Sequence, residues 1–225
     1  MRKIGIIVSL LLLGSASSFS QTKENLFVLG GGISASTNGV GGNIYWNPAP
    51  KWKVQGGYEA MSFRLNFDFE QSNLSMDAKV RYKTGGAFLT AGYQILDWLY
   101  ATGGIELLIF NPEMKAVPQG DYKYGDIYIK PEVVGDVHVK VKSGTSVAPY
   151  LALGFGKQSA YYKRVACGFE VGGYYMGSPK LDMYATGMLS PSEDPNHVET
   201  IRSQISRYRF YPVLKLNIAV KFYSK

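Results

Sequence analysis

The stretch Leu214-Lys-Leu-Asn-Ile-Ala-Val-Lys-Phe222 near the C-terminus decides the fold. Apolar side chains occupy every second position, and lysine, asparagine and alanine stand between them. Because successive side chains of a β-strand point to opposite faces, this alternation predicts a strand with one apolar face and one polar face.

The same period of two recurs in further segments and brings the number of predicted strands to eight. Residues 52–59, 84–93, 99–109, 147–155 and 167–175 alternate clearly, and two glycine-rich segments, 26–35 and 40–46, complete the set. The links between the strands alternate in length. Links 47–50, 96–97 and 157–164 are short, link 36–39 is short as well, and links 63–82, 111–145 and 177–207 are long.

This pattern predicts an all-β fold, an eight-stranded antiparallel up-and-down transmembrane β-barrel with three long extracellular loops. Short links at one end and long links at the other are typical of outer-membrane barrels. Strands of about ten residues, tilted by about 45°, span the hydrocarbon layer. A short helix is expected before the last strand, because Val198, Ile201 and Ile205 have helical spacing and Asp194 or Asn196 can cap it.

A water-soluble barrel alternates in the same way but turns its apolar side chains inward, so periodicity alone leaves both folds open. The polar set of positions is rich in Gly, Thr and Gln, which suits a narrow interior better than an exterior. Aromatic residues also gather near the short-link ends of the strands, as an interface girdle requires. The predicted girdle consists of Trp46, Trp52, Tyr93, Phe155 and Phe222.

The N-terminus predicts export. Arg2 and Lys3 precede an apolar run over residues 4–13, and small residues follow up to Gln21. This is the plan of a secretory signal peptide, and a run of ten is too short for a spanning helix. We therefore expect a signal peptide over residues 1–20 and one domain over residues 21–225, in preference to an N-terminal membrane anchor. The expected location is the cell outer membrane.

Composition excludes several classes of protein. The chain is 46% hydrophobic and 18% charged, which argues against disorder, and its lone Cys167 excludes a disulfide scaffold. The mean hydropathy of -0.07 argues against a helical membrane protein. The formal charge of +7 is scattered along the chain, so no nucleic-acid partner is expected, and attraction to anionic lipid headgroups is the better use of the charge.

The C-terminal stretch also resembles the assembly signal of bacterial outer-membrane proteins. Lys215, Val220 and Phe222 fit that signal, and Asn217 stands where it usually has Gly. Segments 148–156, 173–187 and 210–216 resemble small Gram-negative barrels of the OmpW-like and OmpA-barrel type. The resemblance implies outer-membrane lipid and the barrel assembly machinery as partners. It implies no activity, no cofactor and no named ligand.

Four charged residues share the interior face of the predicted barrel at similar depth: Glu59, Glu106, Glu170 and Lys215. A structural polar plug, with the lysine compensating the buried acids, is the first interpretation. A conducting or proton-sensitive constriction is the second, and a catalytic acid pair is the third. Since so narrow an interior is normally filled by side chains, we expect no open pore.

The long links carry their own alternation. In both arms of 63–82 the apolar residues move to the other set of alternate positions, near Met61 and Thr84, which predicts a hairpin bent by a bulge or a twist. Its apolar face is expected to pack on other loops, or else to bind a partner or a hydrophobic ligand. Residues 121–142 predict a second hairpin.

Catalysis has only weak support. His138 and His197 lie in different long links, and Ser192, Glu193 and Asp194 precede His197 as they do in any polar loop. No metal signature occurs. The sequence favours a non-enzymatic barrel, structural or surface-binding through its loops. The alternative is a narrow transporter for a small or hydrophobic solute.

Overall fold

The computed structural model describes residues 27–71, 74–124, 127–193 and 203–224. The predicted signal peptide lies outside the described residues. So do the predicted helix cap, at Asp194 or Asn196, and two of the helix residues, Val198 and Ile201. Residues 203–205, just before the last strand, are helical. Within the described ranges, the longest apolar helix falls short of the length needed to cross a membrane.

Eight antiparallel strands close into a ring, which confirms the predicted all-β fold and its eight strands. Each strand pairs with the next, and the last returns to the first. In ring order the strands are β1 (Val28–Ser36), β2 (Gly39–Ala49), β3 (Trp52–Gln71), β4 (Leu74–Leu96), β5 (Leu99–Phe110), β10 (Val147–Gly156), β11 (Val165–Tyr175) and β13 (Phe210–Ser224).

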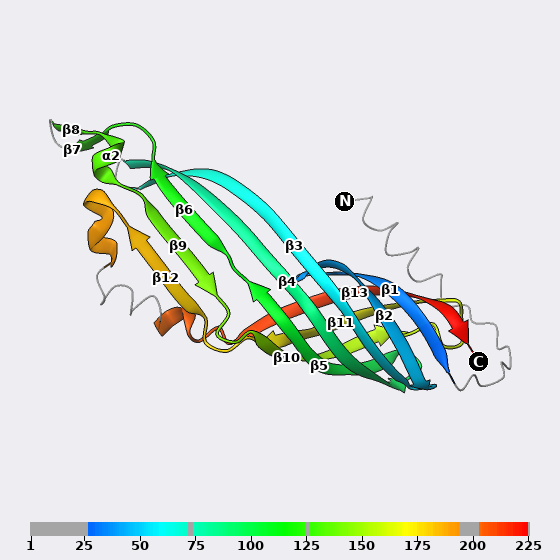
Figure 1. Ribbon diagram of the computed structural model, residues 1–225. Coiled ribbons are helices and arrows are strands. Elements are labelled where there is room, and N and C mark those ends of the chain that lie inside the picture. Colours follow the sequence, from blue (N-terminus) through cyan, green and yellow to red (C-terminus); the bar gives the residue numbers. More distant parts are fainter. Residues whose placement is uncertain (1–26, 72–73, 125–126, 194–202, 225) are drawn as a thin grey trace.

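A second structural unit grows out of one end of the ring. Strands β3 and β4 continue past their neighbours, and three further strands add to β4 in the order β6, β9, β12. These are β6 (Glu113–Pro118), β9 (Val137–Lys142) and β12 (Lys180–Ala185). We call this five-stranded unit the projecting sheet (Figure 1). Each of the three long links therefore contributes at least one strand to this sheet.

Four small elements lie on or beyond the projecting sheet. They are β7 (Tyr122–Tyr124), which pairs with β8 (Ile127–Ile129), the helix α2 (Pro131–Val134) and the 3-10 helix η2 (Gly187–Glu193). The prediction of a single hairpin over 121–142 is wrong. β9 pairs with β6 and β12 instead of β8, because Pro131 and the turn of α2 separate the two segments.

The alternation of the ring strands separates two environments. In β10 every second residue from Ala148 to Gly154 is buried, and the residues between them are exposed. β13 repeats this pattern from Val213 to Ala219. Within the ring segments that the structure describes, the outward positions hold only Gly, Ala, Pro, Cys, aliphatic and aromatic residues. The buried positions carry most of the polar side chains.

The predicted bulge in the β3–β4 hairpin is absent. The two strands stay in one register from Trp52 opposite Tyr93 to Gln71 opposite Leu74. What changes near Ala60 is the chemistry of the faces. Below it the outward residues are apolar, such as Tyr58, and beyond it they are charged, such as Arg64. The strand pairing continues unbroken while the residue types on the outward face change.

Two glycines permit the close approach of β2, β3 and β4 at this level. Gly39 and Gly85 have φ angles of 143° and 138°, which side chains rarely adopt. A Cβ on Gly85 would lie 2.3 Å from the carbonyl oxygen of Glu59, and one on Gly39 would lie 2.3 Å from the carbonyl carbon of Ala60. Both contacts are with backbone atoms, which cannot move aside easily.

We expect Gly85→Ala to lower the free energy of unfolding by about 1–3 kcal/mol, the usual cost of a strained backbone conformation. Gly56→Ala is the control, because its Cβ would lie 3.7 Å from the nearest atom and its φ is ordinary. Denaturant titration followed by tryptophan fluorescence measures both. Equal stability of the two variants would contradict the constraint at Gly85.

Candidate functional site

The four charged residues of the predicted interior cluster lie together inside the ring. Glu59 and Glu106 are fully buried, Glu170 is 1% exposed and Lys215 is 2% exposed. They come from four different strands, β3, β5, β11 and β13. Ring closure brings them together, because each strand contributes alternate side chains to the same narrow space.

Lys215 and Glu59 form the central ion pair, with Nζ 2.8 Å from Oε1. Two serines of β1 donate further hydrogen bonds to the Glu59 carboxylate. Ser34 donates to Oε1 and Ser36 to Oε2, each over 2.7 Å. The rings of Phe88 and Tyr150 flank the ammonium group, with centroids 4.6 Å and 5.4 Å from Nζ. Both charges are thus compensated by groups of the chain itself.

Glu170 is held by three neutral donors. The hydroxyls of Tyr100 and Tyr150 donate to it over 3.2 Å and 2.9 Å, and the amide of Asn217 donates over 3.1 Å. Glu170 also lies directly opposite Lys215 in the register of β11 and β13. The tyrosines reach across from β5 and β10 and Asn217 belongs to β13, so these hydrogen bonds tie four ring strands together inside.

Glu106 connects the interior to the turn between β1 and β2. The Asn38 amide of this turn donates to Glu106 over 2.5 Å and accepts a hydrogen bond from Thr84 over 2.5 Å. Asn38 is fully buried, so the turn folds inward over the ring. The second carboxylate oxygen of Glu106 has no hydrogen-bond partner among the described residues.

A second buried ammonium, that of Lys53, was not among the predicted interior residues. Its Nζ donates over 2.6 Å to the backbone oxygen of Gln158, in the link between β10 and β11. In the same region the Asn47 amide donates to the Ser159 hydroxyl over 2.9 Å. This link therefore folds into the short-link end of the ring. The alternation of residues 52–59 already places Lys53 on the interior face. The sequence does not predict that its hydrogen-bond partner is the backbone oxygen of Gln158.

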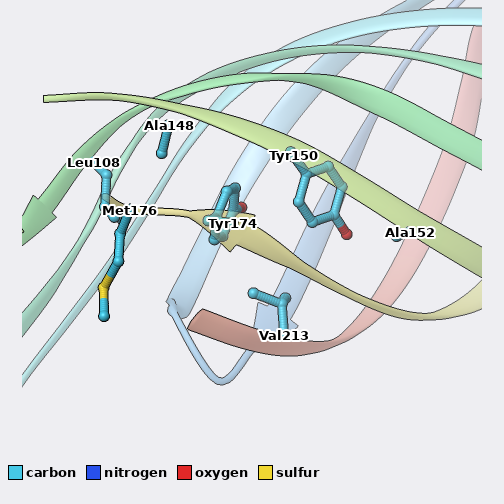
Figure 2. Packing of buried hydrophobic residues seen from close by; sticks show 7 residues of the cluster. All are labelled: Leu108, Ala148, Tyr150, Ala152, Tyr174, Met176 and Val213. Carbon is cyan, nitrogen blue, oxygen red and sulfur yellow. The ribbon is translucent and has the colours of Figure 1, made fainter. Parts of the chain in front are cut away.

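Aromatic and aliphatic side chains fill the other end of the ring. Tyr150 and Tyr174 lie with ring centroids 4.8 Å apart. Figure 2 shows both rings inside the strands, with Val213 below Tyr150. The full cluster contains Leu108, Ala148, Tyr150, Ala152, Tyr174, Met176 and Val213.

The interior therefore holds three carboxylates and two ammonium groups among packed aromatic rings. We call these five residues, Glu59, Glu106, Glu170, Lys53 and Lys215, the interior ion network. Two grooves formed by described residues lie elsewhere, on the outward face. Gly32 and Ile44 help to line one, and Ala101 and Leu151 help to line the other. The network's geometry suits structural charge compensation, because its carboxylates face donors of the chain itself.

The predicted girdle residues lie on the outward face near the short links. Trp46, Trp52, Tyr93, Phe155 and Phe222 are all more than a third exposed. Trp52 packs on Tyr93 with centroids 5.0 Å apart, and Phe155 stacks on Trp98, which the prediction had left out. The assembly-signal residues divide between the two faces. Lys215 and Asn217 point inward and are buried, whereas Val220 and Phe222 are on the outward side.

His138 lies on β9 of the projecting sheet, far from the interior. Its Nε2 is 3.0 Å from Oδ2 of Asp136, and Lys115 lies 3.1 Å from the same oxygen. The Thr186 hydroxyl, His138 and Lys115 together hold the pKa of the Asp136 carboxyl well below its usual range. His197 and Asp194 lie outside the described residues. Within the described ranges, no three potential metal ligands lie together.

Replacing Lys215 by methionine is expected to cost about 3–5 kcal/mol of unfolding free energy, because Glu59 then stays buried without its cation. Adding Glu59→Gln should recover much of the loss, since no uncompensated charge remains. The control is Lys163→Met, at an exposed link position, which should stay within about 0.5 kcal/mol of the parent. A double variant no more stable than Lys215→Met would contradict the ion pair.

Comparison with known proteins supports the fold. No family model and no curated protein matches this chain. The crystal structure of Acinetobacter baumannii CarO is similar at a TM-score of 0.59 and 19% identity, over 89% of this chain and 100% of that one. CarO2 of the same organism matches with a TM-score of 0.59 and 18% identity, over 87% and 98%. At this identity the likeness shows a shared ring architecture.

Proposed function

We propose that the protein is an integral outer-membrane β-barrel with a closed polar interior, which presents the projecting sheet outside the cell. Its role is structural or surface-binding, and it needs no catalytic step. The outer membrane is the location that fits a closed antiparallel barrel with its short links at one end.

The observation that carries this proposal is the outward face of the ring. Leu151 is 71% exposed and Ile44 is 73% exposed, and no charged side chain stands among the outward positions of the described ring segments. Soluble monomers rarely expose contiguous apolar patches of more than a few hundred Å². Lipid is the environment in which an apolar belt around the whole ring is stable.

The outward residues of β4 mark where this apolar belt ends on the side of the projecting sheet. Its outward residues are apolar up to Ala87 and become charged from Lys83 onward. At the other end the aromatic pairs around Trp52 and Trp98 mark the opposite interface. The projecting sheet then stands in the aqueous phase beyond the outer leaflet.

Outer-membrane lipid is the partner that this belt requires. The barrel assembly machinery is the second proposed partner, because the C-terminal residues Val220 and Phe222 stand outward at the end of β13. In this proposal Lys215 and Asn217 have a structural role, because Lys215 pairs with Glu59 and Asn217 donates a hydrogen bond to Glu170 inside the ring.

Leu151→Arg tests the membrane location. Leu151 lies in the middle of β10, so a charge there should cost about 2–4 kcal/mol when the protein is folded in lipid vesicles. Val133→Arg on α2 is the matched control, at an exposed aliphatic residue of the projecting unit, and should be close to neutral. Equally small losses of stability for the two variants would contradict the proposal that lipid surrounds the ring.

Planar-bilayer recording tests the closed interior. Purified protein should give no steady conductance, because Tyr150 and Glu170 are hydrogen-bonded across the interior. Quenching of tryptophan fluorescence by brominated lipid, in the same preparation, verifies that the protein has inserted. A steady open level would contradict the closed interior and favour the narrow transporter.

A further inference from the structure

Strand β3 leaves one long edge without a neighbouring strand. β2 accompanies it only as far as the pair Val40 and Ala60, whereas β3 runs on to Gln71 with β4 on its other side. In the sheet order of the described residues, no other strand pairs with this part of β3. Figure 1 shows β3 as the outer border of the projecting sheet. Such edges are templates for pairing with another chain.

The hydrogen bonds of β4 show which β3 residues face this edge. The carbonyl oxygens of Lys83 and Ser75 accept from Asn111 and Gln119, on the side away from β3. In an antiparallel pair, opposite residues point their backbone groups either toward each other or both away. The register partner of Lys83 is Ser62. Ser62 and every second residue after it therefore present N–H and C=O groups to the free edge.

The charges along this edge are mismatched within the chain. Arg64 lies directly opposite Arg81, and Asp68 lies directly opposite Asp77. Like charges in such positions destabilise a sheet. Asp68 accepts a hydrogen bond from Gln119 over 2.8 Å. Among the described residues no carboxylate forms an ion pair with Arg64.

A second copy of the same edge can place an opposite charge beside both Arg64 and Asp68. An antiparallel pairing with its two-fold axis at Asn66 sets Arg64 of each copy opposite Asp68 of the other. It also sets Leu65 opposite Phe67 on the apolar face. Moving the axis by one residue in either direction leaves Asp68 opposite Ser62 or Asn66, without a cation. Only the axis at Asn66 matches charge with charge at both positions.

We propose that the protein pairs with a second copy of itself through the free edge of β3, antiparallel and centred on Asn66. The interface is isologous, with each copy contributing the same surface. Residues from Ser62 to Glu70 supply about ten backbone hydrogen bonds between the copies. The pairing continues the projecting sheet from one molecule into the next.

The antiparallel direction has a consequence for the orientation of the copies. Figure 1 shows the projecting sheet broadly face-on, with the ring at one end of it. A two-fold axis perpendicular to the sheet therefore places the second ring at the far end. Two rings so arranged sit in facing membranes, so the contact joins one cell surface to another. This orientation rests on the proposed membrane location, whereas the pairing itself does not.

Charge exchange tests the pairing. Arg64→Asp and Asp68→Arg each place like charges opposite one another between copies, so each should weaken dimerisation at least about tenfold in detergent solution. Within the chain both substitutions replace a like-charge pair by an opposite pair, so neither should weaken the fold. The double variant restores complementarity and should dimerise within about threefold of the parent. Sedimentation equilibrium measures all four.

Cysteine cross-linking tests the register in a Cys167→Ser background. Asn66→Cys should give a disulfide-linked dimer under mild oxidation, because the two copies of this residue face each other. Leu65→Cys should give no linked dimer, because Leu65 lies opposite Phe67 of the other copy and two positions away from the other Leu65. A parent that stays monomeric at all concentrations, a dimer indifferent to the charge exchange, or linkage through Leu65→Cys alone would overturn the proposal.

A vesicle-clustering experiment distinguishes the edge pairing from the membrane location. Vesicles carrying the parent should cluster, and vesicles carrying Arg64→Asp should not. A dimer in detergent without clustering would overturn the facing arrangement alone. Failure to insert into lipid would refute the proposed function and leave the edge pairing to the detergent measurements.

Discussion

Ring closure is the constraint on which the rest of this structure depends. Within the described ring segments, eight antiparallel strands close on one another and turn every second side chain into one narrow interior. Charges placed there must find partners on other strands. Lys215 meets Glu59 at 2.8 Å, and Ser34 and Ser36 complete the carboxylate. The same closure turns the remaining side chains outward, where only apolar residues stand along the ring.

The β3–β4 hairpin shows how one pair of strands serves two environments. Its register is unbroken over its whole length, yet its outward face changes from Leu89 and Tyr58 to Arg81 and Arg64. The inward face changes in the opposite sense, from Glu59 to Phe63. In the proposed membrane location, both strands pass from lipid into water with their pairing unbroken. The charged outward edge that results is the surface through which a second copy is proposed to bind.

Much of the ring was predictable from alternation alone. A period of two fixes which residues share a face, so the inward position of Glu59, Glu106, Glu170 and Lys215 followed from counting. Their hydrogen-bond partners did not. Asn38 lies in a turn and Gln158 in a link, and only ring closure brings them to Glu106 and Lys53.

The projecting sheet was the main surprise, because three of its strands, β6, β9 and β12, are short and far apart in the sequence. β9 pairs with β6 of its own long link and with β12 of another, so these pairings join segments that no local pattern connects. The predicted bulge failed for a different reason. A change of apolar parity has the same appearance in a sequence whether the backbone slips by one residue or the solvent changes. The continuous register of β3 and β4 excludes the slip, and the proposed membrane location accounts for the change of face.

The most direct test of this account is a spin-label scan along β4 in lipid vesicles, in a Cys167→Ser background. Labels at Leu89 and Ala87 should be relaxed mainly by oxygen dissolved in lipid, and labels at Arg81 and Lys79 mainly by a water-soluble nickel chelate. A label at Thr90 should be shielded from both, since this side chain is 5% exposed inside the ring. Equal exposure of Leu89 and Arg81 to the chelate would contradict a single continuous strand that passes from lipid into water.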